Sequence, residues 1–490
     1  MTLIRTEGHI MLYIGSYQGR AVVFHNPWGV PTRDLQGREG KKIIGRSIVS
    51  TLYLGMDPKN PQDKGLLDYV KGMTHLVPPE SVSRPEPEKP GYGNRRTGAW
   101  ARRRYGAFDR LPAERNWKEA LMNKPSCHPG NEWERIAPQD AGFHPERLKK
   151  AVDYACQHET PWPRDLPKSI PLNYTEPPEY GGILGPAKER GGPNGLIVRG
   201  GRIAAEWGDT SRVDMTFSVS KSFLSACAGL AFDRGLIRDV HDPVRGYCPD
   251  GGFEPPRNHR ITWHHLLQQT SEWEGCLWGK PDLIDRNRDV GSRGDNSRKG
   301  THRDLQPPGT FWEYNDVRVN RLSLSLLRVW RRPLPEVLKE FIMDPIGASP
   351  TWEWHGYRNS YVEIDGRRLP SVSGGGHWGG GLFISSRDQA RFGLLMLSRG
   401  RWDGKQLLSG QWIERALTPG DVNPGYGYLF WLNGAPKRYP GAPPSSFFAL
   451  GAGHNLIWGD PDHDLVGVAR WIAPEAIDGF LQAVLGALLK

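Results

Sequence analysis

The sequence predicts an α+β fold. An antiparallel sheet is flanked by helices and joined to a mostly helical subdomain, and a small β-rich segment precedes both. Two strand patterns, at residues 194–199 and 202–207, flank Gly200-Gly201, which is the signal of a two-residue hairpin. An amphipathic helix is predicted at 144–156 and an apolar helix from Pro474. We expect these two terminal helices to pack on one face of the sheet.

The 490-residue chain has room for roughly two to four domains. We expect a β-rich segment at residues 1–80, a linker at 81–131 and a larger domain at 132–490. The linker is rich in Pro, Gly and Arg and carries much of the net charge of +10. Its residues 100–108 interleave arginines with aromatics, a pattern that can contact nucleic acid or an anionic polymer. No folded RNA- or DNA-binding motif accompanies it, which favours a charged flexible connector.

Several functional classes are disfavoured by composition. The five cysteines have no CxxC spacing, which argues against a zinc site or a disulfide framework, so we expect no metal and no cofactor. No run reaches the ~18 apolar residues of a membrane-spanning helix. The first residues lack a basic-then-apolar leader, which predicts a cytoplasmic protein unless a leader is missing.

The first segment alternates like a hairpin over residues 8–26, and a further strand is predicted at 42–49. Gly-His-Ile-x-Leu-Tyr-Ile-Gly, followed by His-Asn-x-Trp-Gly, resembles the C-terminal half of an NlpC/P60 cysteine peptidase. The resemblance implies that His9 matches the catalytic histidine and His25 the third polar residue. That family's cysteine lies upstream of the histidine, and no cysteine precedes His9. We therefore expect a catalytically inactive remnant; the alternative is an ordinary β-rich segment with two surface histidines.

The chemistry is concentrated at Ser218-x-x-Lys221, which opens a buried helix predicted to stop near Gly235. Residues three apart at a helix start share one face, so Lys221 is expected beside the Ser218 hydroxyl. A desolvated lysine can serve as the base of a serine nucleophile. The alternative for the four letters alone is a helix cap with an exposed lysine.

The remaining elements follow in chain order. They are a short helix within 261–273, a leucine-rich helix at 322–327, a helix at 389–397 capped by Ser386 or Asp388, and a strand at 465–471.

Four motifs keep a common order over residues 132–490. They are Phe217-Ser-Val-Ser-Lys-Ser-Phe223, His265-Leu-Leu-x-x-Thr-Ser271, Pro308-Gly-Thr-x-x-x-Tyr314 and Gly380-Gly-Leu-x-x-Ser-x-x-Asp-x-Ala-Arg-Phe-Gly393. This order resembles the serine β-lactamase/penicillin-binding-protein-like superfamily. Its class C and esterase branch, with D-aminopeptidases and small-oligomer amide hydrolases, is the nearest in appearance. The fold implied is that of β-lactamases and DD-peptidases.

By that resemblance, Ser218 is the acylated nucleophile and Lys221 its proton partner. Tyr314 falls where class C-like enzymes carry the tyrosine of Tyr-x-Asn, and a phenol between two cations can shuttle a proton. The alternative for Tyr314 is a core aromatic. Asp316 stands at the usual Asn position, and an acid beside Lys221 would hold the lysine charged.

The third motif of the superfamily, Lys-Thr-Gly or His-x-Gly, is replaced by Gly451-Ala-Gly-His454. The missing lysine argues against β-lactam or D-Ala-D-Ala specificity. Gly453 permits close backbone approach, and the N–H of His454 with that of Ser218 is expected to form the oxyanion hole. The His454 side chain is either a polar contact or a strand-end histidine. His377 is a candidate wall residue, with a glycine-loop surface histidine as the alternative.

These features predict a serine hydrolase that cleaves a small-molecule ester or amide through a Ser218 acyl-enzyme. One alternative is a non-catalytic binding or sensor module on the penicillin-binding fold, which Asp316 and the altered third motif favour. A second is an amidase of the β-lactamase or D-aminopeptidase type. A third is a cell-wall-directed fusion whose first 131 residues bind an anionic polymer.

Overall fold

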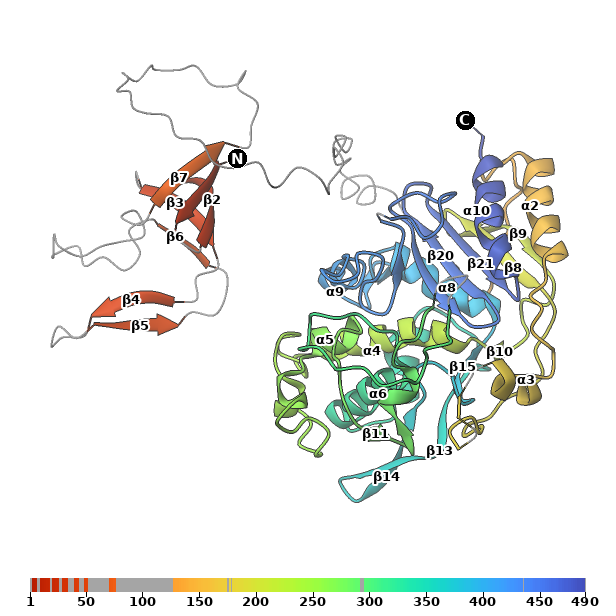
Figure 1. Cartoon of the computed structure of the whole chain (residues 1–490). Helices are drawn as coiled ribbons and strands as arrows, with labels where there is room; N and C mark the ends of the chain where they lie inside the picture. Colours follow the sequence, from red (N-terminus) through yellow and green to blue (C-terminus); the bar gives the residue numbers. More distant parts are fainter. Residues whose placement is uncertain are drawn as a thin grey trace, which may run out of the picture. The chain divides into compact units, whose positions relative to one another are not determined.

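The computed structural model describes residues 127–489, apart from 174–175, 178, 291–294 and 435. Before residue 127 it describes the backbone of seven strands. The chain divides into two units, Met1–Arg110 and Leu111–Lys490, and each is considered by itself (Figure 1). None of the helices in the described part is long and apolar enough to cross a membrane.

The first unit contains a five-stranded sheet of order β6-β3-β2-β1-β7 and a separate β4–β5 hairpin. Its strands are β1 Thr2–Thr6, β2 His9–Tyr17, β3 Arg20–His25, β4 Gly29–Arg33, β5 Glu39–Ile43, β6 Ile48–Thr51 and β7 Val70–His75. The antiparallel β2–β3 pair confirms the predicted hairpin. The single strand predicted at 42–49 is wrong, because that range spans the end of β5 and the start of β6.

Two predictions for this part of the chain stay predictions. The side chains of His9 and His25 lie outside the described residues, so the inactive-peptidase interpretation is not tested. Residues 81–126 of the expected linker also lie outside them.

The second unit is built on a six-stranded antiparallel sheet of order β18-β19-β20-β21-β8-β9. The strands are β8 Asn194–Arg199, β9 Arg202–Trp207, β18 Trp431–Leu432, β19 Phe447–Gly451, β20 Asn455–Asp460 and β21 Leu465–Arg470. The predicted Gly-Gly hairpin is confirmed as β8–β9. Gly200 and Gly201 have φ of 57° and 78°, the left-handed backbone such a turn requires. The β21–β8 pairing joins the two ends of the unit.

Helices cover both faces of this sheet. The terminal helices α2, Pro145–Gln157, and α10, Ile477–Gly486, pack together on one face, as predicted (Figure 1). Helix α8, Ser386–Leu397, lies on the other face. The predicted caps of α8 are wrong: the preceding Ser385 caps it, accepting a hydrogen bond from Asp388 N.

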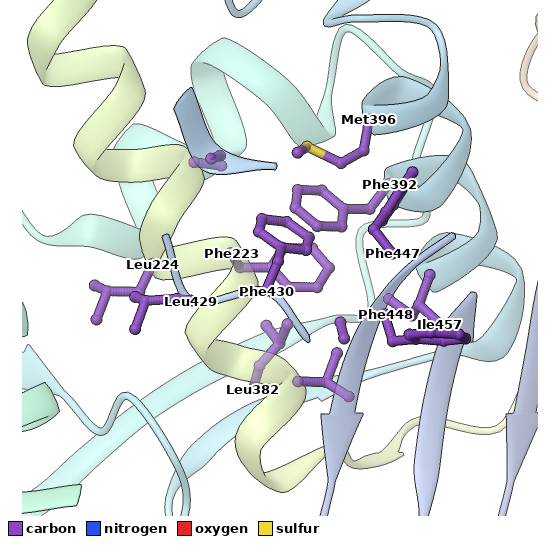
Figure 2. Close-up of a cluster of buried hydrophobic side chains, with 14 of the residues drawn as sticks. Phe223, Leu224, Leu382, Phe392, Met396, Leu429, Phe430, Phe447, Phe448 and Ile457 are labelled. Atoms are coloured by element: carbon purple, nitrogen blue, oxygen red, sulfur yellow. The ribbon is translucent and has the colours of Figure 1, made fainter. Parts of the chain in front are cut away.

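The helical part surrounds α4, Ser220–Asp233, whose residues are buried from Ser220 to Ala231. The ring of Phe223 stacks on Phe392 of α8, with centroids 3.8 Å apart (Figure 2). Gly235, at φ 70°, follows the helix end as predicted. The other helices are α3 Leu166–Asn173, α5 Trp263–Leu267, α6 Asp316–Trp330, α7 Leu334–Leu338 and α9 Gly410–Ala416.

A second sheet, of order β10-β15-β13-β14, supports the glycine-rich loop that precedes β15. Its strands are β10 Asp214–Met215, β13 Glu353–Ile364, β14 Arg367–Val372 and β15 Gly381–Ile384. Short pairs are β11 Cys276–Leu277 with β12 Lys280–Pro281, and β16 Arg401–Trp402 with β17 Lys405–Gln406. Single helical turns are η3 Phe217–Val219, η4 Val244–Gly246, η5 Asn258–Arg260, η6 Asp282–Asp285, η7 Lys339–Met343 and η8 Pro474–Ala476. The fold is the predicted α+β class.

Candidate active site

Ser218 lies in η3, immediately before α4. The preceding Phe217 has φ 50°, a backbone conformation that bulky residues rarely adopt. Its ring is fully buried and meets Trp162 and Trp471 edge-on, which holds the strained turn. From Asp214 to Lys221, only Ser218 is not buried. The local backbone therefore presents this hydroxyl to the adjoining cavity.

Lys221 brings three predicted site residues together. Its Nζ donates a hydrogen bond to Ser218 Oγ at 2.8 Å and another to Asp316 Oδ1. The same Nζ lies 4.7 Å from the centroid of the Tyr314 ring. Because Lys221 is 1% exposed, the alternative of a cap with an exposed lysine is wrong.

Tyr314 is held between an aromatic partner and a helix cap. Its ring stacks on Trp431 at 5.6 Å with an interplanar angle of 18°. The next residue, Asn315, caps α6 by accepting hydrogen bonds from Val317 N and Arg318 N. Sequence reasoning missed Asn315, although an Asn directly before a helical run is a recognised start signal. This cap places Tyr314 and Asp316 on either side of a fixed, buried residue.

Asp316 is the centre of a buried ion-pair network. Its Oδ2 accepts hydrogen bonds from Arg288 Nη1 at 2.6 Å and, with the proton on that ring nitrogen, from His377 Nδ1 at 2.9 Å. Burial raises the pKa of the Asp316 carboxyl, but Lys221, Arg288 and His377 together lower it well below its usual range. The carboxylate is therefore ionised beside Lys221.

His377 is 1% exposed, so the alternative of a surface histidine is wrong. Its Nε2 pairs with Glu176 Oε1 on the side opposite Asp316. Burial lowers the pKa of His377, but the carboxylates of Asp285, Glu176 and Asp316 raise it above its usual value. Burial likewise acts to raise the pKa of Glu176, yet His377 and Lys299 bring it down to about 2.

Glu176, Asp285 and His377 offer ligand atoms that lie within 4.8 Å of one another, a spacing that could hold one metal ion. Lys299 Nζ, however, lies 3.1 Å from Glu176 Oε1 and 3.4 Å from Asp285 Oδ1. An ammonium group thus already meets both carboxylates. We assign these residues to the ion-pair network.

The end of β19 lies beside the nucleophile. A Cβ on Gly451 would lie 2.0 Å from Thr216 O and 3.3 Å from Ser218 N. A Cβ on Gly453 would instead lie 2.4 Å from the Trp471 ring, and Gly453 does not line the cavity at Ser218. The close backbone approach predicted for Gly453 is thus found at Gly451, two residues earlier.

His454 lines the cavity at Ser218 and has φ 60°. Its Nδ1 is buried with no hydrogen-bond partner among the described residues. Burial lowers the pKa of His454 to about 4, so its imidazole is neutral near pH 7.

Two cavities meet at the site. The inner cavity, of about 160 Å³, is lined by residues that include Ser218, Tyr314, Gly451 and His454. The outer cavity, of about 590 Å³, extends toward Trp312. Four residues line both cavities: Arg288, Val290, Trp431 and Arg438. A small molecule with its reactive bond at Ser218 can extend from one cavity into the other.

Comparison with known proteins relates this part of the chain to one family. The profile of the family described as Beta-lactamase matches residues 194–470. The 6-aminohexanoate-dimer hydrolase of Paenarthrobacter ureafaciens is 22% identical over 309 residues, covering 57% of this chain and 73% of that protein.

Two solved structures are similar to the chain at low identity. A penicillin-binding protein homologue from Caulobacter crescentus has a TM-score of 0.46 and 16% identity, covering 71% of this chain and 99% of its own. EstCE1, described as a hydrolase with promiscuous acyltransferase activity, has a TM-score of 0.46 and 15% identity, covering 70% and 99%.

Proposed function

The chain belongs to the beta-lactamase family of hydrolases, and from that premise we propose that it cleaves a small ester or amide through an acyl-enzyme on Ser218. One observation carries the proposal: Lys221 Nζ hydrogen-bonds Ser218 Oγ at 2.8 Å beside a cavity. The 6-aminohexanoate-dimer hydrolase, a relative named for a small-molecule substrate, supports a substrate of that size.

In the proposed reaction Ser218 Oγ attacks the carbonyl carbon and the serine proton passes to a base. Lys221 Nζ contacts Ser218 Oγ on one side and the Asp316 carboxylate on the other. We therefore assign Lys221 the role of a charged residue that orients Ser218. Tyr314 lies near two cations, with Lys221 Nζ 4.7 Å and Arg288 Cζ 5.4 Å from its ring centroid. Because Tyr314 lines the cavity together with Ser218, we assign it as the base that passes the proton to the leaving group.

The tetrahedral oxyanion needs preorganised donors. We assign them to the backbone N–H of Ser218 and one from Gly451, the last residue of β19, or from Ala452 after it, because Gly451 lies against Ser218 N. The neutral His454 beside them is assigned a polar contact to the substrate. Water entering from the cavity then releases the acid and regenerates Ser218.

Covalent labelling tests the proposal. We expect a fluorophosphonate to add to Ser218, as located by peptide mass spectrometry, and a short-chain chromogenic ester to be turned over. The Ser218→Ala variant should lose both the adduct and turnover, leaving at most the ~10³-fold residual catalysis that binding and an oxyanion hole provide. Wild-type protein that forms no adduct, with turnover equal to that of the variant, would sink the enzyme proposal.

A non-catalytic binding or sensor module is the second candidate. Asp316 favours it, because an ionised carboxylate beside Lys221 disfavours the neutral lysine that a serine–lysine pair uses as base. The same labelling separates the two functions: a sensor would bind a small ester or amide without releasing a product.

A further inference from the structure

We propose that Arg438 makes the cavity at Ser218 an anion-binding pocket, so that the preferred substrates are esters or amides that carry a carboxylate. The inference rests on the proposed hydrolase function and deepens it by naming the substrate class. The residue lies in the loop between β18 and β19, outside the four motifs that the sequence predicts for the site.

The inner cavity has an unbalanced positive charge. Arg288 and Arg438 line it, and none of the described residues that line it is an Asp or a Glu. Arg288 is neutralised by Asp316 Oδ2 at 2.6 Å and Asp285 Oδ1 at 3.5 Å. Arg438 forms no ion pair with any carboxylate in the described part of the chain. A substrate carboxylate is the partner that this cation lacks.

The guanidinium of Arg438 also has unused donors. Its Nη2 donates to Val290 O at 3.4 Å and its side chain hydrogen-bonds Tyr439. Its Nε is buried and has no hydrogen-bond partner among the described residues. Because a guanidinium has five N–H donors in a planar fork that matches a carboxylate, donors remain for a bidentate contact.

The fork is held in place before any ligand binds. Arg438 Cζ lies 4.0 Å from the Trp431 ring centroid, a stacking arrangement that restricts the side chain. The neighbouring Tyr439 is fixed by two hydrogen bonds of 2.9 Å with the buried Asn433. A preorganised arginine loses less entropy on binding, which favours its use in recognition.

The position of Arg438 defines where the carboxylate lies. Arg438 and Trp431 line both cavities, so a substrate carbonyl at Ser218 extends past them toward the outer cavity. The outer cavity mixes Arg298 and Lys437 with Asp289 and Asp295, and so does not itself select for one sign of charge. Selection for an anion therefore falls on the boundary at Arg438.

The test compares two p-nitrophenyl esters of equal acyl length, the monoester of glutaric acid and the neutral pentanoate. A hydrogen bond to a charged group contributes about 1.5–3 kcal/mol, so we expect kcat/KM to favour the acid-ended ester by roughly 10- to 100-fold. Arg438→Gln should lose this preference, while Lys405→Gln, which removes the same charge at an exposed position outside both cavities, should keep it. An equal preference in wild type and Arg438→Gln would overturn the inference.

Binding separates this inference from the hydrolase proposal. Calorimetry should show that glutarate binds Ser218→Ala and does not bind Ser218→Ala/Arg438→Gln, with circular dichroism showing that both are folded. Arg438-dependent glutarate binding without cleavage of either ester would refute the hydrolase and retain the anion site. Cleavage of both esters at equal rates, with no effect of Arg438, would refute the anion site and retain the hydrolase.

Discussion

At the level of single residues, the neighbours of Lys221 decide how the Ser218 proton can move. An ammonium group has three donors, and two of them reach Ser218 Oγ and Asp316 Oδ1. Arg288 and His377 share the other oxygen of Asp316. The carboxylate therefore pairs with Lys221, Arg288 and His377 at once. Asp316 thus links Lys221 to His377.

His377 makes the stability of this network depend on pH. Its raised pKa means that the folded state binds the proton more tightly than the unfolded state, in which the histidine pKa is 6.5. Protonated His377 therefore stabilises the folded state fully below pH 6.5, and this contribution is lost as pH rises through the folded-state pKa of His377. The facing groups are Asp316, Asp285 and Glu176, with Lys299 and Arg288 bound to the same carboxylates.

We therefore expect the free energy of unfolding in urea to fall as pH rises above about 6.5 in wild type, with that component missing in His377→Gln. Below pH 6.5 the variant should be less stable, by roughly 3–5 kcal/mol if loss of this buried partner leaves its carboxylates uncompensated. The exposed His144, which makes no side-chain cap bond to α2, provides the matched control His144→Gln. A wild-type pH slope retained in His377→Gln would contradict the assignment.

At the level of elements, the glycine-rich loop before β15 closes over the ion pair. A Cβ on Gly375 would lie 2.2 Å from Asp316 Oδ1 and 2.4 Å from Lys221 Nζ. Gly375 is not one of the glycines that have a left-handed φ. The requirement for glycine is thus one of space, set by contact with α4 and α6.

Gly375→Ala should separate Lys221 from Asp316. We expect a loss of about 1–3 kcal/mol in unfolding free energy from overpacking, and slower labelling of Ser218 by the fluorophosphonate. Gly246→Ala is the control, because its Cβ would meet nothing within 4 Å, and it should change stability by less than about 0.5 kcal/mol. Unchanged labelling and stability in Gly375→Ala would show that the loop does not constrain the pair.

Contiguous motifs explain what the sequence could predict of this site. Ser218 and Lys221 lie one helical turn apart, and Tyr314 and Asp316 flank a helix cap, so their proximity within each pair is local. The contact of His377 with Glu176 joins residues far apart in the chain, and no local pattern encodes it. The motif letters alone point to Gly453 as the glycine near Ser218. The β19–β20 register decides otherwise: Gly451 pairs with Asn455, and Gly453 lies in the turn between them, away from Ser218. Arg438 has no motif at all.

At the level of the whole molecule, strands from the two ends of the second unit pair with each other. The β8–β9 hairpin comes from its first third, yet β8 pairs with β21 near the C-terminus. The backbone of Cys127 lies against Gly201, where a Cβ would come within 1.6 Å of Cys127 O. Any cut that preserves this unit must therefore fall before residue 127.

This closure predicts that Leu111–Lys490 folds without the first 110 residues, because the chain divides at Arg110 into two units with separate sheets. In calorimetry we expect the fragment to unfold in one transition at the Tm that the same unit has in the full chain. It should also label at Ser218 at the full-chain rate. A fragment starting at residue 133 is the comparison: it lacks the Cys127 contact and should unfold at lower temperature. A fall in Tm of several degrees for the fragment from residue 111, which for a domain this large corresponds to more than about 1 kcal/mol, would show that the first unit stabilises the second.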